Sequence, residues 1–292
     1  MSKQFRYTAV LSIAGSDSGG GAGIQADLKT FSALGCYGTS AITAVTIQNS
    51  LGVTGIHRIP ADIVQGQIKV VMDDIKPAAI KIGMVHSPEL AVAIAAILNA
   101  YPQIPVIFDP VMVSTSGYRL IESNTIATLQ KELFPIASLV TPNLDEAEIL
   151  AAMKISTVGD MKEAASRMTQ SGCNAVLIKG GHLKGTDLFD VYLDKNGIEK
   201  IFSSVAIETQ NTHGTGCTLS SAIAAFIGLG NDLGTAIEKA KLYVQQAIIS
   251  GLDVKTGEGH GPLNHFFDSQ NLIKHELNLN TRLAILPKSP DC

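Results

Sequence analysis

The sequence predicts an α/β protein in which helices cover both faces of a mainly parallel central sheet. Short apolar strands alternate with amphipathic helices along most of the 292 residues, which is typical of parallel strands joined by helical crossovers. Two predicted strands, at residues 105–108 and 138–140, end at polar residues beside prolines. A late hairpin with Asn196-Gly197 in its turn predicts an antiparallel edge.

The N-terminal half begins with a strand, a glycine-rich loop and a helix. Residues 7–14 are apolar and rich in β-branched side chains, and residues 24–34 have helical periodicity that stops at Gly35. Ser87, Pro88 and the acidic residue after them predict the start of a helix that runs to about residue 100. The other elements expected here are strands at residues 41–48, 53–59 and 78–82 and a helix after Pro60.

The C-terminal half keeps the same alternation. The elements expected here are strands at residues 105–108, 138–140 and 175–179, a hairpin at residues 191–194 and 198–202, and helices at residues 161–170, 219–229 and 233–250. Residues 272–277 suit one or two helix turns, but later prolines break the pattern, so we expect a loosely held end. Because no linker is visible, we predict one domain over residues 1–268 and a C-terminal tail over residues 269–292.

The composition limits the kinds of partner and compartment. Lysine and arginine total 22 against 26 acidic residues, which gives a formal net charge of −4. Without a basic run we expect no nucleic-acid partner, and without an apolar segment of about 18 residues we expect no membrane partner. The four cysteines are scattered and form no CxxC pair, which favours a reducing, cytoplasmic location over a disulfide framework or a structural zinc site.

One loop with two glycines, residues 211–216, opens directly into an apolar helix. Such a helix start offers unpaired backbone N–H groups and a positive dipole end to an anion. Gly214 and Gly216 let the backbone approach that anion closely, and Cys217 lies where a thiolate is favoured. The pattern indicates phosphate binding beside a reactive group, although a simple helix cap with a buried thiol has the same local sequence.

Charged or amide side chains follow several predicted strands, namely Asp17, Asp109, Asn143 and Lys179. Ligands of parallel sheets bind beyond the carboxyl ends of the strands, so these residues are candidates for one site. Asp109 and Asn143 are equally suited to forming turns. Glu146 lies one helical turn after Asn143, which suits either a metal-bound or water-bound phosphate or a capping box. The spacing alone leaves both interpretations open.

Residues 21–26 satisfy the G-x-G-x-x-A dinucleotide fingerprint between a strand and a helix. That fingerprint needs an acidic residue about 20 positions later to hold a ribose, and residues 43–48 contain none. The P-loop pattern G-x-x-x-x-G-K-S/T does not occur either. If a nucleotide binds, another architecture holds it.

Eight segments occur together in the order and spacing of a known family. They are residues 14–31 and 43–49, Lys81-Ile-Gly-Met84, Asp109-Pro-Val-Met112, Thr141-Pro-Asn143, Lys179-Gly-Gly-His182, His213-Gly-Thr-Gly-Cys217-Thr218 and Gly259-His-Gly-Pro262. With them the sequence resembles the hydroxymethylpyrimidine/phosphomethylpyrimidine kinases of thiamine biosynthesis over about residues 7–267. The resemblance implies a ribokinase-like three-layer α/β/α sandwich.

The resemblance also implies a pocket for a small pyrimidine substrate. Asp27 and Gln48 would bind the aminopyrimidine, since a carboxylate accepts from an exocyclic amine and a carboxamide both donates and accepts along a ring edge. The other pocket residues it implies are Met84 and Val111, against the ring faces, and Gly15 and Ala22, where the ring approaches the backbone.

The same resemblance implies the parts of an ATP-dependent phosphoryl transfer. Cys217 would be the base that takes the proton from the substrate hydroxymethyl group. Since the thiol is mostly protonated at an ordinary pKa of about 8.5, the helix dipole must lower the pKa of Cys217 for this role. The other residues implied are Gly214, Thr215 and Gly216 for the developing charge, Lys179, Asn143, Glu146 and Thr212 for the triphosphate, and Glu146 and Asp109 for Mg²⁺.

The main hypothesis is an ATP- and Mg²⁺-dependent kinase that phosphorylates hydroxymethylpyrimidine and then its monophosphate. A pyridoxal kinase is the nearest alternative, but some of those relatives have a second cysteine in the loop after Asp-Pro-Val-Met, and residues 113–118 contain none. A vitamin-precursor binding protein without turnover is a third hypothesis, and an oxidoreductase ranks last. Because the family usually forms homodimers, we expect a homodimer.

Overall fold

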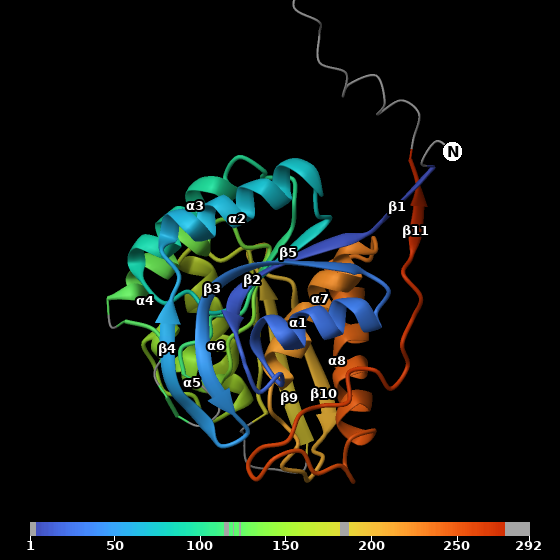
Figure 1. Ribbon diagram of the computed structural model, residues 1–292. Coiled ribbons are helices and arrows are strands. Elements are labelled where there is room, and N and C mark those ends of the chain that lie inside the picture. Colours follow the sequence, from blue (N-terminus) through green and yellow to red (C-terminus); the bar gives the residue numbers. More distant parts are fainter. Residues whose placement is uncertain (1–3, 114–116, 119, 123, 182–186, 278–292) are drawn as a thin grey trace, which may run out of the picture.

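A computed structural model describes residues 4–113, 117–118, 120–122, 124–181 and 187–277. Within these residues a nine-stranded sheet has the order β10-β9-β8-β7-β6-β5-β2-β3-β4. Helices cover both of its faces (Figure 1). The predicted three-layer α/β/α sandwich with a mainly parallel sheet is therefore confirmed.

Most strands are close to their predicted positions, but the strands at residues 5–7 and 274–276 were not predicted. Their bounds are β1 (Phe5–Tyr7), β2 (Ala9–Ser16), β3 (Tyr37–Asn49), β4 (Gly52–Arg58), β5 (Ala79–Ile82), β6 (Val106–Phe108), β7 (Leu139–Val140), β8 (Ala175–Ile178), β9 (Asp187–Asp194), β10 (Glu199–Val205) and β11 (Lys274–Glu276). Strands β2, β3, β5, β6, β7 and β8 pair in parallel, and β9 and β10 form the predicted antiparallel hairpin. Strand β4 is also antiparallel to β3, so both edges of the sheet are antiparallel.

The helices form two layers of unequal size. Their bounds are α1 (Gly23–Ala33), α2 (Ala61–Asp74), α3 (Pro88–Leu98), α4 (Thr125–Thr128), a π-helical segment η1 (Leu129–Leu133), α5 (Leu144–Ala151), α6 (Val158–Gln170), α7 (Thr215–Gly228) and α8 (Leu233–Ile249). The core on one face joins α2, α3, η1, α5 and α6, and the core on the other joins α1, α7 and α8. The segment containing α4 and η1 was not expected from the sequence.

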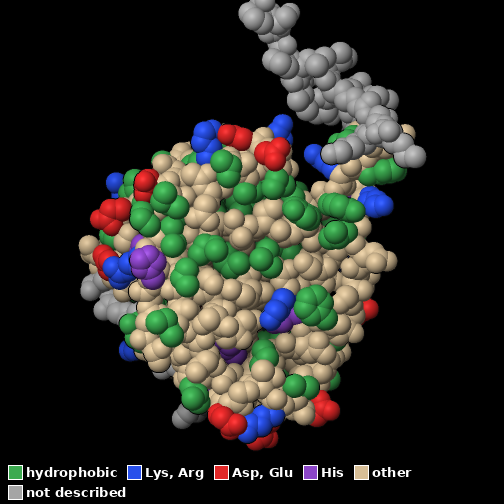
Figure 2. Space-filling model, viewed as in Figure 1, with side chains coloured by type: hydrophobic (Ala, Val, Ile, Leu, Met, Phe, Trp, Pro, Cys, Tyr) green, Lys and Arg blue, Asp and Glu red, His purple; other side chains and the backbone are tan. Residues whose placement is uncertain are grey.

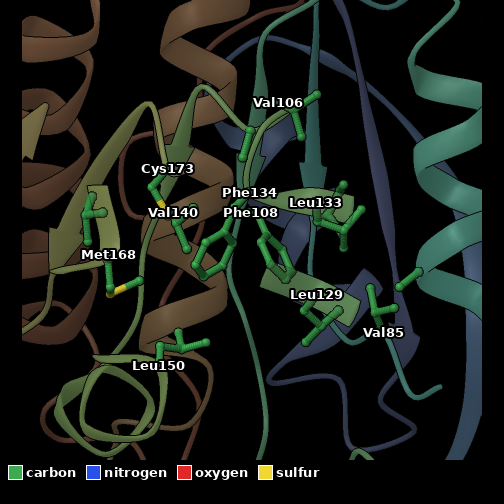
Figure 3. Packing of buried hydrophobic residues seen from close by; sticks show 14 of the residues in the cluster. Val85, Val106, Phe108, Leu129, Leu133, Phe134, Val140, Leu150, Met168 and Cys173 are labelled. Carbon is green, nitrogen blue, oxygen red and sulfur yellow. The ribbon is translucent and has the colours of Figure 1, made fainter. Parts of the chain in front are cut away.

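Alternation along the strands explains why both faces are apolar. Phe108 of β6 belongs to the core under α3 and η1, whereas its neighbour Ile107 belongs to the core under α7. Successive side chains of a strand point to opposite faces, so a strand buried on both faces is apolar throughout. Figure 3 shows Phe108 beside Phe134, with Leu129 and Leu133 of η1 close by. Because β6 is buried on both faces, the position of its end is fixed, and so is the backbone of Asp109, which follows it.

The described part of the C-terminal tail corrects one prediction. The tail forms no helix turn at residues 272–277: strand β11 pairs antiparallel with β1 at the other end of the chain (Figure 1). Backbone N–H groups of Gln270 and Ile273 donate to the carbonyls of Ala33 and Gly35. These bonds fasten the start of the tail beside the end of α1. Residues 278–292 lie outside the described residues.

No helix within the described ranges has both the length and the apolar content needed to cross a membrane. On the face shown in Figure 2, acidic and basic side chains are interspersed and lie mostly towards the rim.

Candidate active site

The carboxyl ends of the parallel strands and the start of α7 enclose a cavity of about 1110 Å³. The cavity brings together every predicted site residue except Asp27, namely Gly15, Ala22, Gln48, Met84, Asp109, Val111, Asn143, Glu146, Lys179, Thr212, Gly214, Thr215, Gly216 and Cys217. These residues come from loops far apart in the sequence. Their assembly follows from the parallel sheet, because strand ends of one direction meet at one edge.

Helix α7 begins at Thr215, and Cys217 lies in its first turn, as the loop over residues 211–216 predicted. Gly214 precedes the helix with a φ of 85°, and a Cβ at this position would lie 1.8 Å from the Gly21 carbonyl oxygen. Only glycine meets both demands. The first-turn N–H groups of a helix have no partner within it, and here they border the cavity. The helix start is thus built as an anion site.

The environment of Cys217 corrects the expectation about its ionisation. Burial raises the pKa of the Cys217 thiol to about 11, and the ammonium group of Lys81 is the main influence that opposes this rise. Loss of water destabilises a thiolate, so the Cys217 thiol is protonated near neutral pH, contrary to the lowered pKa that its role as a base requires.

Lys179 and Asp109 form a buried ion pair next to the start of α7. Lys179 Nζ lies 2.8 Å from Asp109 Oδ1, and the hydroxyls of Thr141 and Ser220 also donate to the Asp109 carboxylate. Burial opposes ionisation of Asp109, but the charges of Lys179 and Lys81 outweigh it and hold the pKa of this carboxyl below its ordinary value. Lys179 thus places one positive charge where an anionic ligand would meet α7.

Asn143 and Glu146 form the capping box that the spacing allowed. Asn143 Oδ1 accepts from the backbone N–H of Glu146 at 2.9 Å, and Glu146 Oε2 accepts from that of Asn143 at 2.8 Å. Both residues nevertheless line the cavity, so capping and ligand binding are compatible. Burial raises the pKa of Glu146 to about 7. A buried carboxyl of this kind is one that a cation would stabilise in its charged form.

The fit to a metal ion is partial. No group of three or more histidine, cysteine, aspartate or glutamate residues within the described chain could hold one. Glu146 and Asp109 both line the cavity, however, and Mg²⁺ is commonly bound by one or two carboxylates together with substrate phosphates and water. The donor set therefore fits Mg²⁺ that arrives with a nucleotide.

The structure corrects the position of Asp27. Its side chain is fully buried beneath the cavity and does not line it. Both carboxylate oxygens lie 2.9 Å from Lys81 Nζ, and Ser12 and Ser221 donate to them as well. With these acceptors occupied, Asp27 holds Lys81, and it is Lys81 that reaches the cavity wall.

We expect Asp27→Asn to lower the free energy of unfolding by about 3–5 kcal/mol, because it leaves the buried Lys81 ammonium without its counter-charge. Urea unfolding followed by circular dichroism measures this change. Asp73→Asn, in the exposed pair with Lys69, is the control and should leave the midpoint nearly unchanged. Equal shifts in the two variants would contradict a structural role for the Asp27–Lys81 pair.

Other cavity residues were not singled out from the sequence. Lys81 and His213 belong to the family motifs, but the sequence indicates no role for them. Asp17 is identified only as a residue that follows the first strand. A further wall comes from the end of β10, the segment after it and one face of α8, including Val205, Ile207, Leu242, Gln245 and Ile248. That wall has no sequence signal, because an apolar helix stripe looks the same against a core and against a ligand.

An anion-binding helix start, a buried lysine, a thiol and a cavity large enough for two ligands define the chain as a phosphotransferase for small molecules, built on a ribokinase-like three-layer fold. The particular family follows from comparison. The chain belongs to the phosphomethylpyrimidine kinase family, whose sequence profile matches residues 17–264.

Individual relatives agree with this assignment. The hydroxymethylpyrimidine/phosphomethylpyrimidine kinase of Rhizobium meliloti is 48% identical over 257 residues, which are 88% of this chain and 96% of that protein. A thiamine biosynthesis bifunctional protein of Geobacter sulfurreducens is 47% identical over 268 residues, 92% of this chain, but the chain spans only 54% of that relative.

A solved structure supports the fold. Staphylococcus aureus pyridoxal kinase in complex with AMP-PCP and pyridoxal superposes with a TM-score of 0.81 at 31% identity, covering 93% of this chain and all of the other.

Proposed function

We propose that this enzyme transfers the γ-phosphoryl group of ATP to 4-amino-5-hydroxymethyl-2-methylpyrimidine and then to its monophosphate, giving the diphosphate used in thiamine biosynthesis. The observation that carries the proposal is the single cavity that holds Cys217, Lys179 and Gln48 together. Phosphoryl transfer needs positioning and charge neutralisation more than covalent chemistry. One end of the cavity suits a flat heterocycle, and the other end suits phosphate groups.

The heterocycle end is apolar with a polar edge. Met84 and Val111 pack together, and a Cβ at Gly15 would lie 3.1 Å from Met84 Sδ. A flat ring fits between such surfaces, while the Gln48 carboxamide is available to its polar edge. Ala22 also lines the cavity. We retain these five residues as the proposed pyrimidine contacts and assign Asp27 to holding Lys81.

The charged side chains of the cavity are proposed to bind the phosphate groups and the metal ion. Lys179, Asn143 and Thr212 are proposed to contact the triphosphate, and the apolar wall from α8 and the segment after β10 leaves room for the nucleoside. Asp109 and Glu146 would hold Mg²⁺, which neutralises phosphate charge when bound. Lys179 and Asp109 lie side by side as an ion pair. Lys179 could therefore bind a phosphate whose metal ion is held by Asp109.

The residues at the start of α7 are proposed to act on the substrate alcohol. Cys217 Sγ takes the proton of the hydroxymethyl oxygen as that oxygen attacks phosphorus. The backbone N–H groups of Gly214, Thr215, Gly216 and Cys217 face the transferring group and stabilise its developing charge. Lys81, below the thiol, supplies a positive charge that favours the thiolate.

The proposal is tested by following ADP release from ATP and Mg²⁺ with hydroxymethylpyrimidine, its monophosphate or pyridoxal. We expect turnover with both pyrimidines, each with kcat/KM at least ~10-fold above that for pyridoxal, a selectivity within reach of a few pocket contacts. Release with pyridoxal alone would establish the pyridoxal kinase alternative. Binding of a pyrimidine without any ADP release would instead support a non-catalytic binding protein.

The cysteine-free segment at residues 113–118 favours the pyrimidine over pyridoxal on sequence alone. Its residues 114–116 lie outside the described residues. A homodimer and a cytoplasmic location likewise remain proposals. The dimer has some support from exposed apolar side chains near one sheet edge, where Val45, Ile47 and Leu51 are 44%, 68% and 67% exposed.

A further inference from the structure

His213, the first residue of the 213–218 stretch, contacts two other residues of the cavity wall. Its Nε2 lies 2.9 Å from Asp17 Oδ2 and 3.5 Å from the side-chain nitrogen of Gln48. The ring lies against Gly21, where a Cβ would come within 2.1 Å of it. The side chain is therefore held firmly beside Gln48, which the proposed function places against the pyrimidine; the inference below rests on that function.

The ionisation of Asp17 determines which side chain, Asp17 or His213, carries the hydrogen of the bond between them. Its carboxylate accepts from the backbone N–H groups of Gly19, Gly21 and Ala22. Although burial opposes ionisation, the hydrogen bond from His213 and these backbone bonds hold the pKa of Asp17 below its ordinary value. An ionised carboxylate only accepts, so the hydrogen between the two side chains lies on His213 Nε2. That hydrogen is directed at Asp17, so His213 Nε2 has no lone pair left to accept from the Gln48 side-chain nitrogen 3.5 Å away.

Thr46, a second neighbour of the Gln48 side chain, acts towards it as a hydrogen-bond acceptor. Its Oγ1 lies 2.8 Å from the Ser16 carbonyl oxygen and 3.1 Å from the side-chain oxygen of Gln48. A hydroxyl has one hydrogen, and the closer carbonyl, which can only accept, takes it. Thr46 Oγ1 is then left as an acceptor towards Gln48.

These two neighbours select one orientation of the Gln48 amide. A half-turn about the last side-chain bond exchanges its oxygen and nitrogen, and hydrogen bonding decides between the two orientations. Nitrogen facing His213 and oxygen facing Thr46 would oppose donor to donor and acceptor to acceptor. The half-turn places the amide oxygen beside the His213 N–H group, which stays bonded to Asp17, and lets the amide nitrogen donate to Thr46, so both conflicts are removed.

We propose that His213, held by Asp17, is a specificity-determining positioning residue that fixes the orientation of the Gln48 amide. After its two contacts, Gln48 retains one N–H and one oxygen lone pair for a ligand. They match an exocyclic amine beside an unprotonated ring nitrogen, as in a 4-aminopyrimidine. A 4-oxopyrimidine, with a carbonyl beside a ring N–H, needs the opposite order. Its ring cannot turn over to compensate, because the hydroxymethyl group must face Cys217.

The test compares kcat/KM for 4-amino-5-hydroxymethyl-2-methylpyrimidine and for its 4-oxo analogue at saturating ATP. We expect the unaltered enzyme to prefer the amino compound at least ~100-fold, since a polar group left unpaired in the site penalises the analogue. In His213→Leu the amide is free to turn, and the preference should fall at least ~10-fold. Thr46→Val removes the opposite contact and should act in the same direction.

Two further variants separate positioning from structure. His213→Gln keeps a donor and should retain most of the preference, and His260→Leu replaces an exposed histidine outside the cavity and should not change it. A merely structural defect lowers kcat/KM for both pyrimidines equally and leaves their ratio intact. An unchanged ratio in both His213→Leu and Thr46→Val would overturn the inference.

The inference can still be tested if a variant does not fold or if the proposed function is wrong. Should His213→Leu not fold, the ratio in Thr46→Val decides. Should the unaltered enzyme phosphorylate neither pyrimidine, the proposed function is wrong, and calorimetric dissociation constants of the two compounds for the same variants test the amide orientation by itself.

Discussion

Cys217→Ala is expected to lower kcat at least ~100-fold and to leave the dissociation constant of the pyrimidine nearly unchanged. A general base contributes about this much to a rate, whereas the apolar contacts and Gln48 that would bind the ring do not depend on the thiol. Steady-state ADP release measures the first quantity, and calorimetry with the pyrimidine measures the second.

Cys173→Ala is the matched control, because this thiol is buried in the core under α6, away from the cavity. It should leave kcat unchanged. Full activity of Cys217→Ala would remove the thiol from the mechanism.

The pH dependence gives a second test of the thiol. A base acts in its deprotonated form, and burial raises the pKa of the Cys217 thiol to about 11. The deprotonated fraction therefore rises with pH across the neutral range, and we expect kcat/KM to increase about tenfold per unit between about pH 7 and 9. A flat profile would contradict a base with this pKa.

Lys179→Met is expected to lower kcat/KM for ATP by ~10²–10³-fold. Its ammonium group would neutralise phosphate charge in a site with little water, where one lost electrostatic contact typically has an effect of this size. The KM for the pyrimidine should change much less. Methionine keeps most of the side-chain volume, so the charge is the main quantity removed.

Removal of the Lys179 charge also leaves Asp109 buried without its partner, and this could destabilise the fold. The double variant Lys179→Met/Asp109→Asn removes both charges and should recover most of the unfolding free energy without recovering turnover. Lys154→Met, at an 89% exposed side chain, is the control. A double variant with restored activity would show that Lys179 acts only through Asp109.

Much of the site followed from the sequence because its residues come directly after strands. Asp109, Asn143 and Lys179 could be placed in one site by the rule that parallel strands end at one edge, and the structure assembles them there. Gly214 was recognisable because a loop that opens into a helix needs a glycine where φ is positive. These inferences use local chemistry and one rule of topology.

Asp27 shows where such reasoning fails. An acidic residue in a motif suggests a ligand contact, but its partner Lys81 lies 54 residues away and meets it only in the folded core. The wall from α8 was missed for a related reason: its apolar stripe gives no sign of whether it faces protein or a cavity. The tail looked like a loose end because the pairing of β11 with β1 joins opposite ends of the chain.

The sequence by itself determined the layered α/β fold, the glycine loop that opens into α7 and the family, because periodicity, glycine positions and strand ends are local properties of a chain. Only the tertiary structure decided which polar groups are already paired. It pairs Asp27 with Lys81, Lys179 with Asp109, and His213 with Asp17 beside Gln48. Hydrogen bonds and charges between distant residues depend on distances that the fold alone sets, and these pairings leave Cys217, Lys179 and Gln48 facing the cavity.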